Sequence, residues 1–162
     1  MPRVLMAGLP GTGKSTLAAH LANALQGIVL NKDVIRAAVF PEPFVEYSIE
    51  QDELVMDLML AAAAWLEQRH PSLWIFFDGR TFSRRAQRAR VAAAYTILCA
   101  CPEELAERRL ANDTSHPARN RDFALYQRVR AQFEPIDGPH WIAETSRPLA
   151  DLLAEGLRYL KG

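Results

Sequence analysis

The chain has 162 residues, 49% of them hydrophobic, and its 19 basic and 19 acidic side chains balance to a formal net charge of zero. This length suits one domain, residues 1–162, with an apolar core, and a neutral chain has no overall attraction for nucleic acid or an anionic membrane. No apolar run approaches the roughly 18 residues that cross a bilayer, and no leader precedes residue 8, so we expect a cytoplasmic protein without a membrane partner.

The first expected strand, residues 3–8 (RVLMAG), runs directly into GLPGTGKST, residues 8–16. The pattern G-x-x-x-x-G-K-[ST] is met by Gly8, Gly13, Lys14 and Ser15. In such a loop the backbone N–H groups converge on phosphate oxygens. The alternative is a glycine-rich turn that only caps a helix, but the order of strand, loop and expected helix at 14–25 favours phosphate binding.

We expect this loop to hold ATP. The predicted ATP-binding residues of the loop are Gly11, Thr12, Gly13, Lys14, Ser15 and Thr16. Glycines let the backbone approach an anion, and the helix that follows adds the positive end of its dipole. Lys14 is expected to reach the β- and γ-phosphates and to take part in catalysis, and Ser15 to ligate Mg²⁺.

The second expected strand, 27–31, runs into the segment NKDVIR, residues 31–36, which contains Asp33 and Arg36. In an open parallel sheet, ligands lie beyond the carboxyl ends of the strands, so these side chains belong near the loop. A carboxylate there can accept the proton of an acceptor hydroxyl in phosphoryl transfer, which makes Asp33 the expected catalytic base. Asp33 could instead serve only as a helix N-cap. Arg36 is the expected acceptor-binding residue.

A long helix is expected from a capping box formed by Ser48 and Gln51 to about residue 69. Its apolar residues recur on one face, which we expect to lie in the core: Leu54, Leu58, Ala62 and Trp65.

The third expected strand, 73–79, has Asp78 near its end and is followed directly by Arg80. Asp78 closes an apolar run, which is the usual position of an acid near Mg²⁺ on the strand beside a phosphate loop. It is therefore predicted either to hydrogen-bond to ligands of the metal without binding the ion itself, or to contact the acceptor. The fourth, 95–101, contains Cys99 and Cys101, whose side chains should point to opposite faces and remain unpaired in the core.

The middle of the chain is basic, with eleven arginines against five acidic residues over 80–130. This charge suits a site for several phosphates, although arginines that only solvate helix faces would explain most of it. Within it, residues 112–119 (NDTSHPAR) are polar and interrupted by proline, and this segment begins an expected lid that extends to about residue 133.

The last expected strand, 140–145, is followed by Arg147, which could stack on the adenine or merely be solvated. Five apolar runs separated by helices indicate parallel strands buried on both faces. The remaining helices are expected at 83–93, 103–111, 120–133 and 147–160. The sequence therefore predicts an α/β protein with three α/β/α layers.

The order of these motifs carries a resemblance over nearly the whole chain. The phosphate loop, then NKDVIR, then FFDGRTFSRRAQR, then CPEELAERRL before the lid, is similar to the small P-loop kinase family of AAA type that includes polynucleotide 5′-hydroxyl kinases, chloramphenicol phosphotransferase and zeta toxins. The resemblance implies a P-loop NTPase fold whose five parallel strands have the order 2-3-1-4-5, with a small helical lid.

The resemblance also implies a general base at Asp33, an acceptor contact at Arg36, and lid arginines that clamp the transferring phosphate. That family often repeats an arginine three residues after the one that ends the ERR helix, whereas here Arg109 is followed at this spacing by Asn112. The candidate clamp residues are therefore Arg109, Arg119 and Arg121.

Together these features predict an ATP-dependent kinase that transfers the γ-phosphoryl group to a hydroxyl of a small-molecule or nucleotide-type acceptor, with Mg²⁺ as cofactor. The nearest alternative is a polynucleotide 5′-hydroxyl kinase, for which nucleic acid would be the substrate. An alternative from another class is a nucleotide-binding switch or regulatory ATPase with no acceptor.

Overall fold

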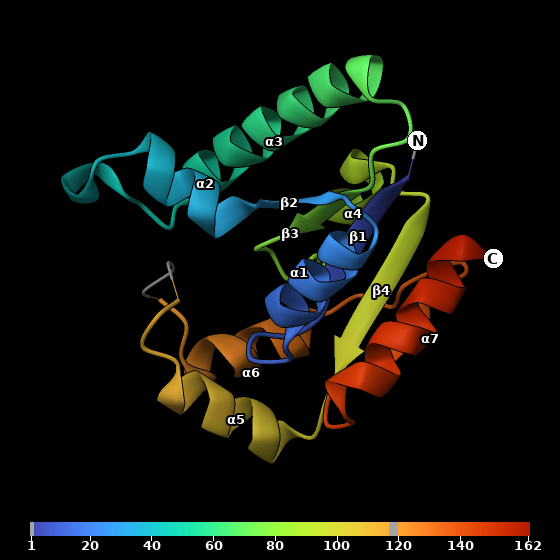
Figure 1. The fold of residues 1–162 in the computed structure, drawn as a ribbon. Coiled ribbons are helices and arrows are strands. Elements are labelled where there is room, and N and C mark those ends of the chain that lie inside the picture. Colours follow the sequence, from blue (N-terminus) through green and yellow to red (C-terminus); the bar gives the residue numbers. More distant parts are fainter. Residues whose placement is uncertain (1, 117–119) are drawn as a thin grey trace.

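The computed structural model describes residues 2–116 and 120–162. Its five strands form one parallel sheet in the order β2-β3-β1-β4-β5, as Figure 1 shows. The strands are β1 (Arg3–Ala7), β2 (Ile28–Asn31), β3 (Ile75–Asp78), β4 (Tyr95–Ala100) and β5 (Trp141–Glu144). The strand order and the α/β class predicted from the sequence are both confirmed.

Helices connect the strands. They are α1 (Lys14–Ala24), α2 (Lys32–Val39), the 3₁₀ turn η1 (Glu42–Phe44), α3 (Ile49–Arg69), α4 (Arg85–Val91), α5 (Glu103–Asn112), α6 (Phe123–Gln132) and α7 (Leu149–Lys161). No sequence pattern predicted η1, and a helix at α2 was implied only by the alternative interpretation of Asp33 as an N-cap. None of the helices in the described parts of the chain is long and apolar enough to cross a membrane.

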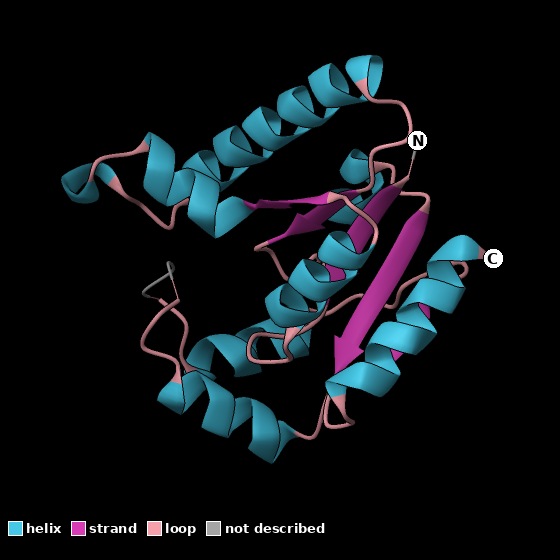
Figure 2. Ribbon diagram, viewed as in Figure 1, coloured by secondary structure: helices cyan, strands magenta, loops and turns pink. Residues whose placement is uncertain are grey.

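Helices cover the sheet on both faces, which gives the three layers seen in Figure 2. On one face, α1 and α7 pack against strand side chains such as Val4, Phe76 and Ile97. On the other face, α3 packs against Leu5 and Phe77. Both faces of β1 and β3 are buried, so these two strands are almost continuously apolar, as is typical of strands inside a parallel sheet.

The face of α3 that enters the core differs from the expectation. The buried side chains are Val55, Met56, Met59 and Ala63, whereas Leu54, Leu58, Ala62 and Trp65 all lie on the exposed side. The buried face also carries Glu67, which is 5% exposed. Its carboxylate can be buried because Arg3 donates two hydrogen bonds to it, at 2.6 and 2.8 Å. A core face interrupted by a buried ion pair does not look apolar in sequence.

The start of α3 also differs in detail. Ser48 caps the helix, since its Oγ accepts from the backbone N–H of Gln51 at 3.2 Å. The reciprocal bond of a capping box is absent, because the Gln51 side chain instead accepts from the N–H of Glu46 at 2.7 Å and donates to the carbonyl of Phe44 at 2.9 Å. Gln51 thus secures the η1 turn to α3.

A third, smaller cluster lies at the carboxyl ends of the strands, where Ala106 and Leu110 of α5 pack with Tyr126 of α6. Cys101 packs against this cluster while Cys99 belongs to the main core, so the two thiols are separated and free, as expected. Helices α5 and α6 therefore form one side of the opening above the sheet, and α2 with the start of α3 forms the other (Figure 1).

Candidate functional site

The loop between β1 and α1 has the backbone that its glycines predict. Gly11 and Gly13 have φ angles of 76° and 79°, in the left-handed region, and Gly13 is the N-cap of α1. A Cβ atom on Gly11 would approach the carbonyl oxygen of Ala106 to 2.7 Å. Only glycine fits there, so α5 can pack directly against the loop.

Lys14 lies beneath this loop. Its ammonium group is buried and donates to the carbonyls of Gly8 at 3.0 Å and Leu9 at 2.9 Å. Burial lowers the pKa of this lysine, and the nearby guanidinium of Arg121 acts in the same direction. A buried cation whose partners are neutral carbonyls, beside a glycine-rich loop at a helix N-terminus, is an arrangement that favours an incoming phosphate.

The loop is fixed to the far strand by a residue that no sequence pattern singled out. Thr145, directly after β5, donates from its Oγ1 to the carbonyl of Thr12 at 2.8 Å. Arg109 donates to the Thr145 hydroxyl at 3.1 Å and to its carbonyl at 2.8 Å. The predicted clamp residue Arg109 is therefore held beside the phosphate loop, at the β5 side of the opening.

Asp78 ends β3 and is fully buried. Its Oδ2 accepts from the Asn31 side chain at 2.9 Å, while its Oδ1 has no hydrogen-bond partner among the described residues. A buried carboxylate oxygen without a partner is costly, so this atom is suited to accept a cation or a hydrogen-bond donor that enters the cavity. Ser15, exposed at the start of α1, and Asp78 together offer the oxygen donors that Mg²⁺ prefers when it is bound mainly through phosphates.

Asn31, and not Asp33, caps α2. The Asn31 Oδ1 accepts from the backbone N–H groups of Asp33 at 3.0 Å and Val34 at 3.1 Å. The alternative interpretation of Asp33 as only a helix cap is therefore wrong, and its carboxylate is free of that task. Asn31 joins the cap of α2 to Asp78, a link that no sequence pattern indicated.

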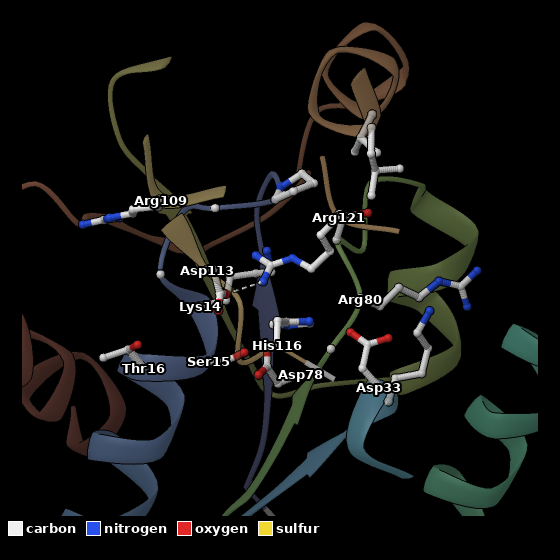
Figure 3. A pocket seen from close by; sticks show the side chains of 18 of the residues that line it. Lys14, Ser15, Thr16, Asp33, Asp78, Arg80, Arg109, Asp113, His116 and Arg121 are labelled. Carbon is white, nitrogen blue, oxygen red and sulfur yellow. Dashed lines mark hydrogen bonds and ion pairs between the residues drawn. The ribbon is translucent and has the colours of Figure 1, made fainter. Parts of the chain in front are cut away.

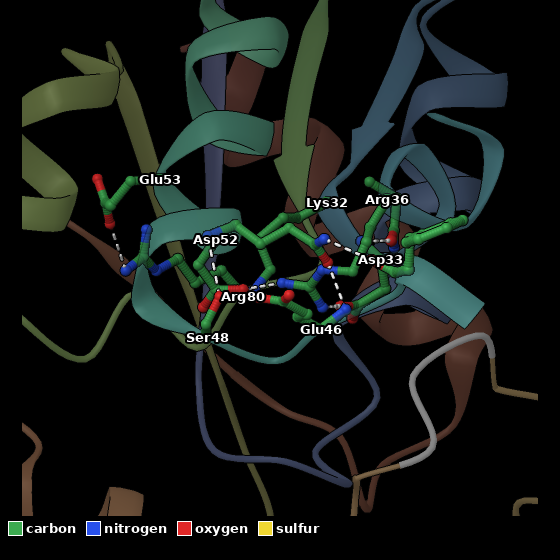
Figure 4. A network of polar contacts seen from close by, with 11 residues as sticks. Lys32, Asp33, Arg36, Glu46, Ser48, Asp52, Glu53 and Arg80 are labelled. Carbon is green, nitrogen blue, oxygen red and sulfur yellow. Dashed lines mark hydrogen bonds and ion pairs between the residues drawn. The ribbon is translucent and has the colours of Figure 1, made fainter. Parts of the chain in front are cut away.

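The Asp33 carboxylate is held by Arg36, one turn further along α2. The Arg36 side chain is 3% exposed. Its guanidinium contacts Asp33 at 3.3 Å, forms an ion pair with Asp52 and lies over the ring of Tyr47, 5.1 Å from its centroid. Lys32 contacts the same carboxylate of Asp52 at 2.8 Å. Figure 4 shows these side chains converging from α2 and α3.

Helix α2 and the start of α3 form one wall of the opening, and on this wall Lys32 and Arg36 both pair with Asp52. No sequence pattern singled out Lys32 or Asp52. Arg80, after β3, adds a third cation and pairs with Glu53 at 2.9 Å. Burial lowers the pKa of Lys32 to about 8, and the nearby charges of Arg36 and Arg80 act in the same direction. The wall is therefore an alternation of charges rather than a patch of one sign.

The remaining predicted residues are spread around the opening. Arg121, within the expected lid, pairs with Asp113 at 3.1 Å, and Figure 3 shows the two side chains turned toward each other near Lys14. Arg147 pairs with Glu155 at 2.6 Å and its side chain remains 43% exposed. The third clamp candidate, Arg119, lies outside the described residues.

A cavity of about 1190 Å³ brings these groups together beyond the carboxyl ends of the strands. Figure 3 looks into it, with Asp33 and Arg109 on opposite sides. The predicted site residues that line it are Gly11, Gly13, Lys14, Ser15, Thr16, Asp33, Arg36, Asp78, Arg109, Arg121 and Arg147. Thr12 is buried behind the loop and is held by its own bond to the Leu9 carbonyl.

A parallel sheet of this order, with a phosphate loop between β1 and α1, defines the fold of P-loop kinases. Residues 4–136 match the family described as AAA domain, and the chain belongs to that family. No curated protein matches the chain in sequence.

Solved structures share the fold at low identity. A sugar kinase from Janibacter sp. HTCC2649 has 17% identity and a TM-score of 0.70, over 99% of this chain and 95% of that one. The APS kinase of Mycobacterium tuberculosis, solved with AMPPNP and APS, has 17% identity, a TM-score of 0.69 and coverage of 99% and 98%. A shikimate kinase from Bacteroides thetaiotaomicron has 14% identity, a TM-score of 0.70 and 99% coverage of both chains.

These likenesses show the fold. They agree with the resemblance seen in the sequence at the level of small P-loop kinases, and they do not single out polynucleotide kinases, chloramphenicol phosphotransferase or zeta toxins.

Proposed function

We propose that this protein is an ATP-dependent kinase that transfers the γ-phosphoryl group to a hydroxyl of a small-molecule or nucleotide-type acceptor. The observation that carries the proposal is the position of Asp33. It lines the same cavity as Lys14 and Ser15, it has no capping task, and Arg36 holds its carboxylate in place. A switch that only binds nucleotide has no need of a carboxylate held in this way.

On this proposal, the phosphate loop binds the nucleotide. The N–H groups of Gly11 to Ser15 surround the β-phosphate, and Lys14 shifts from the loop carbonyls to the β- and γ-phosphates. Ser15 would hold Mg²⁺, and Asp78 would support it from behind its direct ligands or contact the acceptor. The ion, when bound, neutralises charge on the phosphate oxygens.

Across the cavity, Asp33 accepts the proton of the acceptor hydroxyl as the oxygen forms its bond to the γ-phosphorus and the bond to the leaving ADP breaks. Arg36 orients the acceptor beside that carboxylate. Arg121, and Arg109 beside the loop, supply positive charge where negative charge develops on the transferring group. Arg147 borders the nucleotide side of the cavity, where it would contact the base.

The acceptor itself can be found by measuring ATP consumption with and without small alcohols, antibiotics, nucleosides, nucleotide sugars and 5′-hydroxyl oligonucleotides. A kinase is stimulated by its acceptor, whereas a regulatory ATPase is indifferent to the whole panel. Stimulation by the oligonucleotides alone would favour the polynucleotide 5′-hydroxyl kinase alternative.

Asp33→Asn tests the assignment of the base. We expect a kcat lower by about 10²–10⁴ with ATP affinity nearly unchanged, because the carboxylate touches the acceptor and not ATP. Lys14→Ala is the companion variant that should lose ATP-dependent activity altogether, and Asp151→Asn, an exposed acid at the start of α7, is the matched control. Full acceptor-dependent turnover in Asp33→Asn would remove its catalytic role.

A further inference from the structure

Helix α3 is apolar on two faces, and only one of them is covered by the sheet. The second face presents Leu54, Leu58, Ala61 and Trp65 to solvent, with Leu54 48%, Leu58 39% and Trp65 54% exposed. The steps between them are four, three and four residues, the spacing of a helix-pairing seam. We call these four residues the α3 seam.

No other element in the described part of the chain covers this seam, and Figure 1 shows α3 running along the outer edge of the molecule. A continuous apolar stripe over three turns of an exposed helix is unusual for a surface, where isolated apolar side chains are normal. The seam therefore has the character of an interface.

We propose that the α3 seam pairs with the seam of a second copy of this chain, in an antiparallel two-fold dimer. The positions of the seam are symmetric about the middle of α3. In the antiparallel register, Leu58 of one copy faces Ala61 of the other, and Leu54 faces Trp65. The small alanine beside the axis accommodates the leucine opposite, which lets the two helices approach closely at the centre of the seam.

The charged residues at the two ends of α3 favour the same antiparallel register. Continuing the symmetric pairing outward by one turn places Glu50 of one copy against Arg69 of the other, at both ends of the interface. Both residues are exposed, and Arg69 already lies over the ring of Trp65 at 3.9 Å from its centroid. A parallel pairing would set Glu50 against itself, which is repulsive, whereas the antiparallel pairing opposes unlike charges and aligns the helix dipoles favourably.

This interface involves α3 alone and does not depend on the proposed kinase activity. One helix pair buries less surface than a standard stable complex, so we expect a dimer that dissociates in the micromolar range. Sedimentation velocity between about 1 and 100 µM should therefore show the transition from one copy to two.

Trp65→Glu places a charge in the seam and should leave the protein monomeric throughout that range, with unchanged thermal unfolding because the side chain is outside the core. Ile142→Glu is the matched control, since Ile142 is 57% exposed on β5, away from α3, and this variant should still dimerise. A wild-type protein that stays monomeric, or a dimer that survives Trp65→Glu, would overturn the proposal.

A charge exchange tests the register. Glu50→Lys and Arg69→Glu should each weaken the dimer about tenfold, because each sets like charges against one another. The double variant restores unlike pairs and should recover most of the wild-type dissociation constant. If the double variant dimerises more weakly than either single variant, the antiparallel pairing is excluded.

Discussion

Among individual side chains, Lys32 has a pKa that its surroundings lower well below the ordinary value. It is buried at the start of α2, next to Asp33, and contacts Asp52 at 2.8 Å. Burial lowers its pKa from 10.5 to about 8. The folded protein therefore holds this proton less tightly than the unfolded chain does.

This difference predicts a dependence of stability on pH. Between pH 8 and 10.5 the unfolded chain keeps the Lys32 proton that the folded protein has lost, so the free energy of unfolding rises with pH across that window. Relative to Lys32→Met, the wild type should gain up to about 1.4 kcal/mol per pH unit there, and nothing below pH 8. Urea unfolding at pH 7, 8.5 and 10 measures the gain.

The comparison with Lys32→Met is needed because the pKa of Lys14 is lowered as well, and its titration adds to the wild-type curve. The difference between the two proteins cancels that contribution. Equal pH dependence in both would mean that Lys32 keeps its ordinary pKa in the folded protein.

At the scale of single elements, the start of α2 depends on Asn31, which both caps the helix and donates to Asp78 at 2.9 Å. We predict that Asn31→Ala lowers the free energy of unfolding by about 1–2 kcal/mol and reduces turnover, since the helix turn that presents Asp33 loses its cap. Chemical unfolding and acceptor-dependent activity measure the two effects.

Asn31→Ser separates the two contacts. A serine caps a helix about as well as asparagine but is too short to reach Asp78, so this variant should retain most of the stability and lose turnover only to the extent that the Asp78 contact matters. If the serine and alanine variants lose equal stability, the cap does not contribute what we expect.

The expected lid, about residues 112–133, is the other element whose behaviour can be tested. Arg121 precedes α6 and pairs with Asp113 over the cavity. We predict that hydrogen exchange slows in residues 120–133 when AMPPNP and Mg²⁺ bind, because closure over the nucleotide would bury this segment. Helix α7 is the internal control and should be unaffected. Exchange in 120–133 that ignores the nucleotide would refute the lid assignment.

At the scale of the whole molecule, the position of α7 relies on one close approach. Gly156 of α7 lies where an added Cβ would be 2.9 Å from both Leu21 of α1 and the Trp141 ring of β5. We predict that Gly156→Val lowers the free energy of unfolding by about 1–3 kcal/mol through overpacking. Ala154→Val, on the exposed side of the same helix, is the control and should cost only the small loss of helix propensity. Thermal and urea unfolding compare the two.

Local sequence patterns were enough to predict the strands, their parallel arrangement and the phosphate loop. Each is a local pattern: a buried parallel strand must be apolar throughout, and the loop needs glycine at Gly11 and Gly13 for a left-handed backbone. It also placed Asp33, Arg36 and Asp78 correctly around one cavity, because strand ends meet at the same edge of the sheet.

Contacts between distant segments determine which face of α3 is buried and which residues hold the predicted site residues in place. Both faces of α3 carry apolar residues, so periodicity cannot choose between them. The buried face also contains the charged Glu67, whose partner Arg3 is far away in the chain, so this face does not look apolar in the sequence. Asn31, Asp52 and Thr145 act through contacts with distant segments. Such contacts leave no local pattern, because what makes these residues matter is the neighbour that folding brings to them.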